Sequence, residues 1–520
     1  MAAKKSVQLY DTTLRDGSQG EDISFSVQDK LLIARRLDDL GLHFIEGGWP
    51  GANPKDVQFF EEAKKLSLKN AKLVAFGSTR KAHTRAADDS NLRGLVEAGT
   101  SVITIFGKSW DMHVREVFKV ELDENLRMIS DSVKFLKSRG KEVIYDAEHF
   151  FDGYFANPAY ALKTLKAAAD AGASVLVLCD TNGGTMPSKL SRAVADVRKK
   201  LKTPVGIHTH NDCGMAVANA VAAVEAGATH VQGCMNGFGE RTGNADILVA
   251  AANLQVKLGY ACVPPQKLKD FTAAARYVNE VANMVPAKNQ PYVGQSAFAH
   301  KGGVHIDAVK KNPQTYEHVD PAVVGNLRHH LVSEVGGRTN IMLKAQEFGI
   351  ELKKDAPETK KILQEVQRLE NEGWQFEGAD ASVELLIRNV TGGTKKFFQA
   401  TAEIKNERIG DQDPNVEAVV TVELNGKKEK VQKTGDGPVD ALGLALQDAL
   451  AKFYPQVREV ELDDYKVRIV NSKAGIAAKV RVVIEFHDKH RIWSTVGVST
   501  NIIEASWQAL VDAYRYKLSK

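Results

Sequence analysis

The feature that most constrains the fold of this chain is a series of eight short β-branched segments, each followed by a longer amphipathic stretch. Strands that alternate with helices in this way form parallel sheets. Eight such units in roughly 250 residues are what a closed (β/α)8 TIM barrel requires. The expected strands are Val7–Tyr10, Phe44–Gly47, Lys72–Phe76, Val102–Phe106, Glu142–Asp146, Ser174–Cys179, Val205–His208 and His230–Gly233.

An open, doubly wound α/β sheet is the alternative to a barrel. Such a sheet usually has fewer strands and a glycine fingerprint after the first one, and no fingerprint follows Tyr10. The polar clusters of the chain instead follow strand ends: Asp11–Gly17, Glu46–Trp49, Asp180–Gly184 and His208–Asp212. Barrel enzymes carry their active sites at the C-terminal ends of the strands, so this placement favours the barrel.

Composition limits the possible partners and compartments. The 520 residues carry 69 basic and 65 acidic side chains, a net charge of +4, which indicates no nucleic-acid partner. No stretch is long and apolar enough to span a membrane, and the N-terminus has no apolar signal segment. The four cysteines are widely spaced, so we expect reduced thiols and a cytoplasmic protein.

The length of the chain requires more than one domain. We expect a catalytic barrel over residues 1–266, a helical linker region over 267–374 and a regulatory or dimerisation domain over 375–520. This last domain is predicted to be α+β, with two β-β-β-α repeats. Its expected strands are Ser382–Arg388, Phe397–Ile404, Val416–Leu424, Tyr465–Val470, Ala477–Phe486 and Ile492–Val498, and its expected helices are Asp440–Phe453 and Asn501–Tyr516.

The chemistry-bearing motif is His208-Thr209-His210, which follows the seventh expected strand. Because side chains alternate along a strand, both imidazoles point to the same side, where they can bind one metal ion. Asp16, after the first strand, can complete a shell of one aspartate and two histidines with open positions for a substrate. Taken singly, the aspartate suits a surface turn with a salt bridge, and the histidines suit a packed or solvent-facing pair. Their convergence on one rim favours the metal site.

The loop Gly237–Asn244 follows the eighth strand. It can form a tight glycine turn with an ion pair between Glu240 and Arg241. Alternatively, it can bring Asn244 to the metal and backbone N–H groups to an anionic ligand.

Four motifs resemble the isopropylmalate/homocitrate/citramalate synthase family. They are Leu14–Gln19 with Lys30 eleven positions later, Val205–Ala218, Gly239–Asn244 and Gly497–Ser506. The resemblance covers nearly the whole chain. Two further segments, Ile105–Asp111 and Tyr145–Gly153, are most similar to the branch of the family that uses pyruvate.

The resemblance implies an acyltransferase that condenses acetyl-CoA with a 2-oxo acid. Pyruvate is the expected oxo acid, and 2-oxoisovalerate, the substrate of isopropylmalate synthases, is the alternative. His149 stands where the isopropylmalate synthases usually carry an acid, and this departure counts against that alternative. The implied cofactor is a divalent metal ion, Zn, Mn or Mg, bound by Asp16, His208 and His210, with Asn244 as a weaker ligand.

The family pattern also implies the other site residues. Arg15 faces the keto oxygen, Glu148 is an acid in the pocket, and Thr181 holds the carboxylate of the oxo acid. His305, the expected base, and Tyr316 come from a neighbouring subunit, so the resemblance implies a homodimer or a larger homo-oligomer.

Substrate size is expected to be set by three bulky residues near strand ends, Phe76, Phe106 and Tyr145. Each of them is equally compatible with ordinary barrel packing. If they wall the pocket, their bulk admits the methyl group of pyruvate and excludes a branched side chain.

The C-terminal repeats imply feedback control, with isoleucine as the expected inhibitor near a dimer interface. The alternative is a dimerisation domain with no ligand. Two other classes remain open at this point: a metal-dependent lyase or aldolase on the same barrel, and a non-catalytic amino-acid sensor.

Overall fold

The computed structural model of the chain describes residues 5–330, 338–376, 378–393, 397–407, 415–470 and 478–520. The chain divides into two compact units. One is formed by Met1–Phe298 with Val319–Leu327, and the other by Ala299–His318 with Arg328–Lys520. Each unit contains hydrophobic cores of its own.

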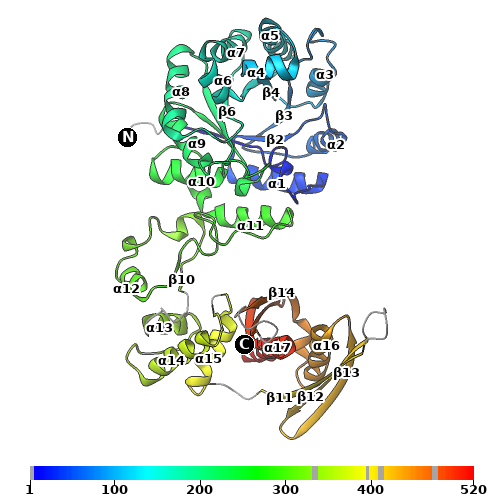
Figure 1. Ribbon diagram of the computed structural model, residues 1–520, viewed down its shortest axis with the longest axis vertical. Coiled ribbons are helices and arrows are strands. Elements are labelled where there is room, and N and C mark those ends of the chain that lie inside the picture. Colours follow the sequence, from blue (N-terminus) through cyan, green and yellow to red (C-terminus); the bar gives the residue numbers. More distant parts are fainter. Residues whose placement is uncertain (1–4, 331–337, 377, 394–396, 408–414, 471–477) are drawn as a thin grey trace. The chain divides into compact units, whose positions relative to one another are not determined.

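The first unit contains a closed barrel of eight parallel strands in sequence order, which confirms the predicted fold class. Strand β1 closes the barrel against β8, with Tyr10 opposite Gln232. Figure 1 shows the helices of this unit arranged around the strands. The strands are β1 (Gln8–Asp11), β2 (Phe44–Gly48), β3 (Lys72–Ser78), β4 (Val102–Lys108), β5 (Glu142–Glu148), β6 (Val175–Asp180), β7 (Val205–Thr209) and β8 (His230–Gly233).

Local signals define the helices of the barrel. Helix α1, for example, begins with a capping box in which Ser26 and Asp29 bond to each other's backbone N–H, and it ends at Gly41 with a φ of 83°. The helices are α1 (Val27–Leu40), α2 (Pro54–Ala63), α3 (Ser90–Glu97), α4 (Asp111–His113), α5 (Leu122–Ser138), α6 (Phe150–Ala156), α7 (Pro158–Ala171), α8 (Pro187–Lys200), α9 (Ala216–Glu225) and α10 (Ile247–Ala252). Helix α11 (Phe271–Val281) also packs on this core, through Phe271 and Val278.

Alternation along the strands sorts the side chains into two layers. One buried cluster fills the barrel interior: Tyr10, Phe44, Val74, Val102, Ile144, Val175, Val177 and Cys179. Residues of the opposite parity, such as Ile103, Tyr145 and Leu176, belong to the larger core between the sheet and the helices. The parity of a strand residue therefore decides whether it can reach the inside of the barrel.

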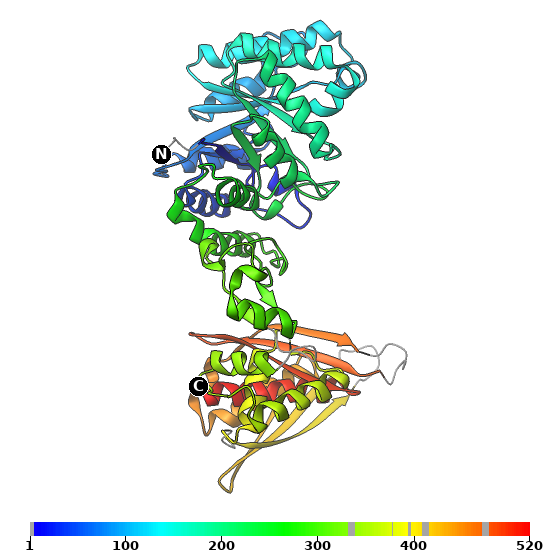
Figure 2. The ribbon, with the colours of Figure 1, turned by 90° about the vertical axis from the view of Figure 1, so that its left-hand side faces the viewer.

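The second unit contains two three-stranded antiparallel sheets and several helices. Each sheet is followed by one helix, α16 or α17, that packs on it; Figure 2 shows α17 against its strands. The elements are β9 (Ala299–His300), α12 (Gly303–Lys311), β10 (His329–His330), α13 (Arg338–Glu347), α14 (Pro357–Asn371), α15 (Asp380–Val390), β11 (Gln399–Glu407), β12 (Asn415–Leu424), β13 (Lys427–Gly435), α16 (Pro438–Ala451), β14 (Glu461–Ile469), β15 (Val480–His487), β16 (Ile492–Ser499) and α17 (Ile502–Ser519).

The two β-β-β-α repeats are present, but the three strands of the first repeat are not the three that we predicted. The expected strand Ser382–Arg388 is wrong, because these residues lie in helix α15, which is apolar on much of its surface. The actual third strand, β13, was missed because Val431 is its only apolar residue. In the second repeat, the expected end residue Ala477 lies outside the described residues.

Within the described part of the chain, no helix has both the length and the apolar character that a membrane crossing needs.

Candidate active site

Three of the predicted metal ligands converge at the carboxyl end of the barrel. His208 lies in β7 and His210 directly follows it, and Asp16 comes from the loop between β1 and α1. The Nε2 atom of His208 lies 3.2 Å from Nε2 of His210 and 3.2 Å from Oδ2 of Asp16. One ligand atom from each residue falls within 4.8 Å of the others, and all three residues are buried. This donor set suits a divalent cation.

The electrostatics of the cluster favour cation binding. Burial opposes ionisation of Asp16, but Arg15 and the two histidines hold its pKa well below the ordinary value. Burial and the neighbouring His208 lower the pKa of His210 to about 3. Burial also acts to lower the pKa of His208, but Asp16 outweighs it, so that pKa is raised. Asp16 is therefore ionised and His210 neutral near pH 7, the states in which these side chains bind metals.

Asn244 lies next to this cluster, because its backbone forms an isolated bridge with that of His210. Its Nδ2 atom donates to the carbonyl oxygen of Phe238 over 3.1 Å, which identifies the other amide atom as the oxygen. This Oδ1 atom is buried and has no hydrogen-bond partner among the described residues. A buried acceptor without a donor is costly, and a cation would satisfy it.

Arg15 is held rigidly beside the cluster. Its Nε atom donates to Oε1 of Glu46 over 2.6 Å, and its guanidinium lies 3.8 Å from the ring centroid of Phe76. Glu46 in turn accepts a hydrogen bond of 2.5 Å from the hydroxyl of Tyr10. The guanidinium is also 3.5 Å from Asp16. A fixed, permanently charged donor next to the candidate metal site can stabilise an oxygen anion that forms there.

A cavity of about 260 Å³ opens over these residues. It contains eight of the predicted site residues: Arg15, Asp16, Phe76, Phe106, Glu148, Thr181, His208 and His210. Six residues without a predicted role also line it: Gln19, Trp49, Asp146, Cys179, Glu240 and Arg241. Its volume suits a small organic acid.

Aromatic rings form one wall of this cavity. Phe76 and Phe106 stack with their centroids 5.5 Å apart and their planes 19° from parallel. Trp49 meets both rings edge-on, at 6.0 and 5.6 Å. Each ring braces the others, so the wall cannot yield easily to a larger substrate.

Tyr145 does not line the cavity, contrary to our expectation. It is fully buried in the core between the sheet and the helices. Its neighbour Asp146 has the inward parity and lines the cavity instead. Burial, and then the proximity of Glu46, raise the pKa of Asp146 to about 7.

Glu148 and Thr181 also line the cavity. Glu148 forms an ion pair with Lys108, a residue that the sequence reasoning did not single out. The hydroxyl oxygen of Thr181 accepts a hydrogen bond of 2.9 Å from the backbone N–H of His149. That bond leaves the hydroxyl proton of Thr181 available to donate.

His305 and Tyr316 belong to the second unit and not to the unit that contains the cavity. The structure brings these two residues together: their rings stack with centroids 4.2 Å apart and planes 26° from parallel. Both side chains are exposed, and Tyr316 retains 48% of its accessible surface. The pair is therefore open to solvent on its own unit.

Sequence reasoning missed several inward-facing polar residues of the barrel, among them Glu46, Lys108, Asp146 and Gln232. Each lies on a strand at the parity that points into the barrel. The direction of each side chain follows from that of an apolar residue two positions away on the same strand, as Glu46 follows Phe44 on β2. Marking every second residue of each expected strand as inward-facing could have identified these polar residues.

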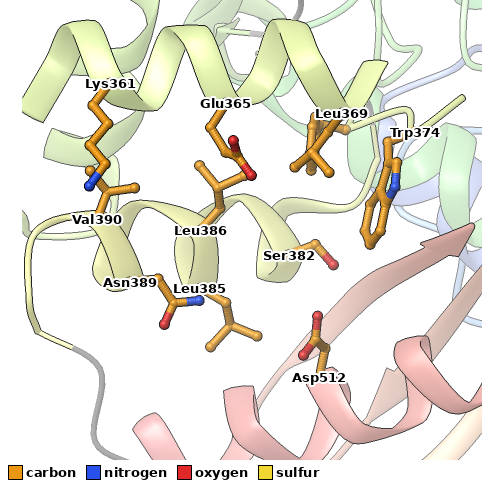
Figure 3. Close-up of a pocket in the computed structure, with 11 residues that line it drawn as sticks. Lys361, Glu365, Leu369, Trp374, Ser382, Leu385, Leu386, Asn389, Val390 and Asp512 are labelled. Carbon is orange, nitrogen blue, oxygen red and sulfur yellow. The ribbon is translucent and has the colours of Figure 1, made fainter. Parts of the chain in front are cut away.

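A separate cavity of about 450 Å³ lies within the second unit, among α14, α15 and α17 (Figure 3). Figure 3 shows Asp512 pointing from α17 toward Ser382 of α15. The two acids of this cavity already have basic partners, since Glu365 pairs with Arg368 at 2.7 Å and Asp512 lies 3.3 Å from Arg515. Its remaining wall is mainly apolar.

Comparison with known proteins agrees with the motifs of the sequence. Residues 6–278 match the family model described as HMGL-like, residues 292–373 the homocitrate synthase post-HMGL domain-like model, and residues 377–518 the LeuA allosteric (dimerisation) domain. A protein of Geobacter sulfurreducens named (R)-citramalate synthase is 52% identical to the chain, covering 99% of it and 98% of the relative.

The chain belongs to the isopropylmalate/homocitrate/citramalate synthase family. It is therefore an enzyme of the acyltransferase type. A second (R)-citramalate synthase, from Aquifex aeolicus, is also 52% identical, over 99% of this chain and 98% of its own length. A probable 2-isopropylmalate synthase of Methanopyrus kandleri is 31% identical, over 97% of each chain.

Proposed function

We propose that the chain condenses acetyl-CoA with pyruvate and water to give (R)-citramalate and CoA. The observation that carries this proposal is the small cavity in which Arg15 and a metal-ligand cluster face a braced aromatic wall. The relatives support it, because those named (R)-citramalate synthase are much more similar to the chain than the 2-isopropylmalate synthase. Citramalate formation would then begin a route from pyruvate to isoleucine.

Asp16, His208 and His210 would hold a divalent metal ion, with Asn244 as an additional ligand through Oδ1. The buried, unpartnered Oδ1 atom and the facing Nε2 atoms support this fit. Zn, Mn and Mg are the candidate ions. When bound, such an ion supplies Lewis-acid polarisation of the keto group of the oxo acid.

The chain's own residues orient the oxo acid and stabilise developing charge. Arg15, fixed by Glu46, donates to the keto oxygen and meets the alkoxide that forms during attack. Thr181 donates its hydroxyl proton to the substrate carboxylate. Glu148, which forms an ion pair with Lys108, provides the acid of the pocket. Together these contacts hold the carbonyl carbon for attack by a thioester enolate.

The proton on the methyl group of acetyl-CoA must be removed by a base held close to it. We assign this role to His305, acting directly or through a water bound to Tyr316. The stacking of the two rings fixes their relative orientation. We assign the pair to a neighbouring subunit of a homodimer, and the match to a dimerisation domain supports an oligomer.

The four cysteines are free thiols, which supports the cytoplasmic location that we propose.

A substrate panel tests the proposed reaction. Release of CoA thiol from acetyl-CoA should be about 100-fold more efficient with pyruvate than with 2-oxoisovalerate, because an isopropyl group meets the stacked rings of Phe76 and Phe106. Phe106→Ala should narrow this preference at least about tenfold. Phe60→Leu, a change in a buried aromatic residue of α2, is the control and should leave the preference intact. Equal rates with both oxo acids, or a preference for 2-oxoisovalerate, would refute the assignment to pyruvate.

We also propose that isoleucine inhibits the enzyme through the C-terminal repeats. The match of residues 377–518 to an allosteric domain supports this role. Addition of isoleucine should lower the rate of thiol release and should produce heat of binding in calorimetry. Leucine and valine are the matched controls, and we expect weaker effects from both. If neither isoleucine nor leucine binds or inhibits, the repeats serve dimerisation alone.

A further inference from the structure

Gln232 occupies a fully buried position inside the barrel, directly beside one of the proposed metal ligands. The register of β7 and β8 pairs Gly206 with His230 and Ile207 with Val231, so His208 and Gln232 follow next to each other. The Oε1 atom of Gln232 lies 2.9 Å from Nδ1 of His208. Its amide nitrogen donates to Oδ1 of Asp146 over 3.1 Å.

The second of these bonds fixes the orientation of the amide. When Asp146 is ionised, its oxygen can only accept a hydrogen bond, so the atom of Gln232 that faces it is then the NH₂ group. The carbonyl oxygen of the same amide then faces His208. Turning the amide around would place two acceptors against each other at the ionised Asp146, in the buried interior of the barrel.

The orientation of the amide in turn fixes the tautomer of His208. A carbonyl oxygen can only accept, so Nδ1 of His208 must carry a proton. Nε2 is then the nitrogen that can offer its lone pair when a metal ion binds. This is the nitrogen that lies 3.2 Å from both Asp16 and His210, at the centre of the ligand cluster.

We propose that Gln232 is a positioning residue that holds His208 in the tautomer and ring orientation required to bind the metal ion. Asp146 accepts a hydrogen bond from the amide nitrogen of Gln232, and the carbonyl oxygen of Gln232 accepts one from Nδ1 of His208. The donor in the first bond therefore determines the donor in the second. The inference rests on the metal site proposed above. Partners of this kind, one step removed from the metal, typically contribute 10- to 100-fold to metal affinity.

Substitution of Gln232 by leucine or methionine tests this role, because both keep the approximate volume and remove the acceptor. We expect Zn²⁺ affinity, measured by competition with a chromophoric chelator, to fall about 10- to 100-fold. Asn279→Leu is the matched control, since Asn279 is a buried amide of α11 that donates to the carbonyl oxygen of Ala275. It should bind Zn²⁺ as tightly as the unmodified enzyme. Unchanged affinity in both Gln232 variants would overturn the proposal.

A second measurement needs no change at Gln232 and no bound metal. Nitrogen-15 NMR of histidine-labelled, metal-free enzyme in mildly alkaline buffer reports the tautomer of His208, which is assigned by its loss in His208→Gln. We expect Nδ1 to carry a proton whatever the protonation state of Nε2, and an unprotonated Nδ1 would refute the role of Gln232. Failure of the unmodified enzyme to bind Zn²⁺ would instead count against the metal site, and the two failures are therefore distinguishable.

Discussion

Replacing Arg15 by alanine should reduce turnover about 100- to 1000-fold while leaving the barrel folded. The structure fixes Arg15 in two ways, by an ion pair with Glu46 and by stacking on the aromatic ring of Phe76. Its loss removes a charge that acts mainly when the keto oxygen becomes an alkoxide. Thiol-release kinetics with acetyl-CoA and pyruvate measure this effect, and circular dichroism checks the fold.

Two controls separate catalysis from other consequences of the change. Arg15→Lys keeps the positive charge but loses the planar guanidinium with its fixed set of N–H donors. Its turnover should therefore lie between that of Arg15→Ala and that of the unmodified enzyme. The metal content of Arg15→Ala should stay close to that of the unmodified enzyme, because Arg15 is not a ligand in this account. Near-normal turnover in Arg15→Ala would contradict the proposed role.

Replacing His210 by alanine should abolish tight metal binding and lower activity by roughly 1000-fold or more. The Lewis-acid contribution of a catalytic metal is several kcal/mol, and each 1.36 kcal/mol is tenfold in rate. A strong chelator should have the same effect on the unmodified enzyme. Added Zn²⁺ or Mn²⁺ should restore the chelated enzyme but not His210→Ala. Elemental analysis and thiol release together measure both effects.

His230→Phe provides the matched control for His210→Ala. His230 is also a buried histidine of the barrel, but it packs against Tyr10 and Phe44, with ring centroids 5.3 and 5.6 Å away. A phenylalanine can occupy that space, so this variant should keep its metal and its activity. If His210→Ala retained full metal content and rate, the cluster would not be the catalytic metal site.

Much of the barrel could be predicted because each strand is short, apolar and separated from the next by a helix. The parity of His208 and His210 could be predicted in the same way, since two residues one position apart on a strand must share a side. The same rule, applied more strictly, would have chosen Asp146 over Tyr145 for the cavity. Tyr145 was selected for its bulk, but parity places it among the helices.

Other features had no readable signal in one sequence. The Ser382–Arg388 segment is an apolar run, and such a run fits a strand and a buried helix equally well. Strand β13 is almost entirely polar, so its pairing with β12 comes from the sheet and not from its own composition. The role of Gln232 depends on the register of β7 against β8, which local patterns do not specify.

The most direct test of the central claim is a crystal structure of the enzyme soaked with Mn²⁺ and pyruvate, with anomalous data collected above the manganese edge. The account predicts one anomalous peak within about 2.0–2.4 Å of ligand atoms from Asp16, His208 and His210, with pyruvate reaching it beside Arg15. A cavity without such a peak, or a metal held elsewhere in the chain, would contradict it.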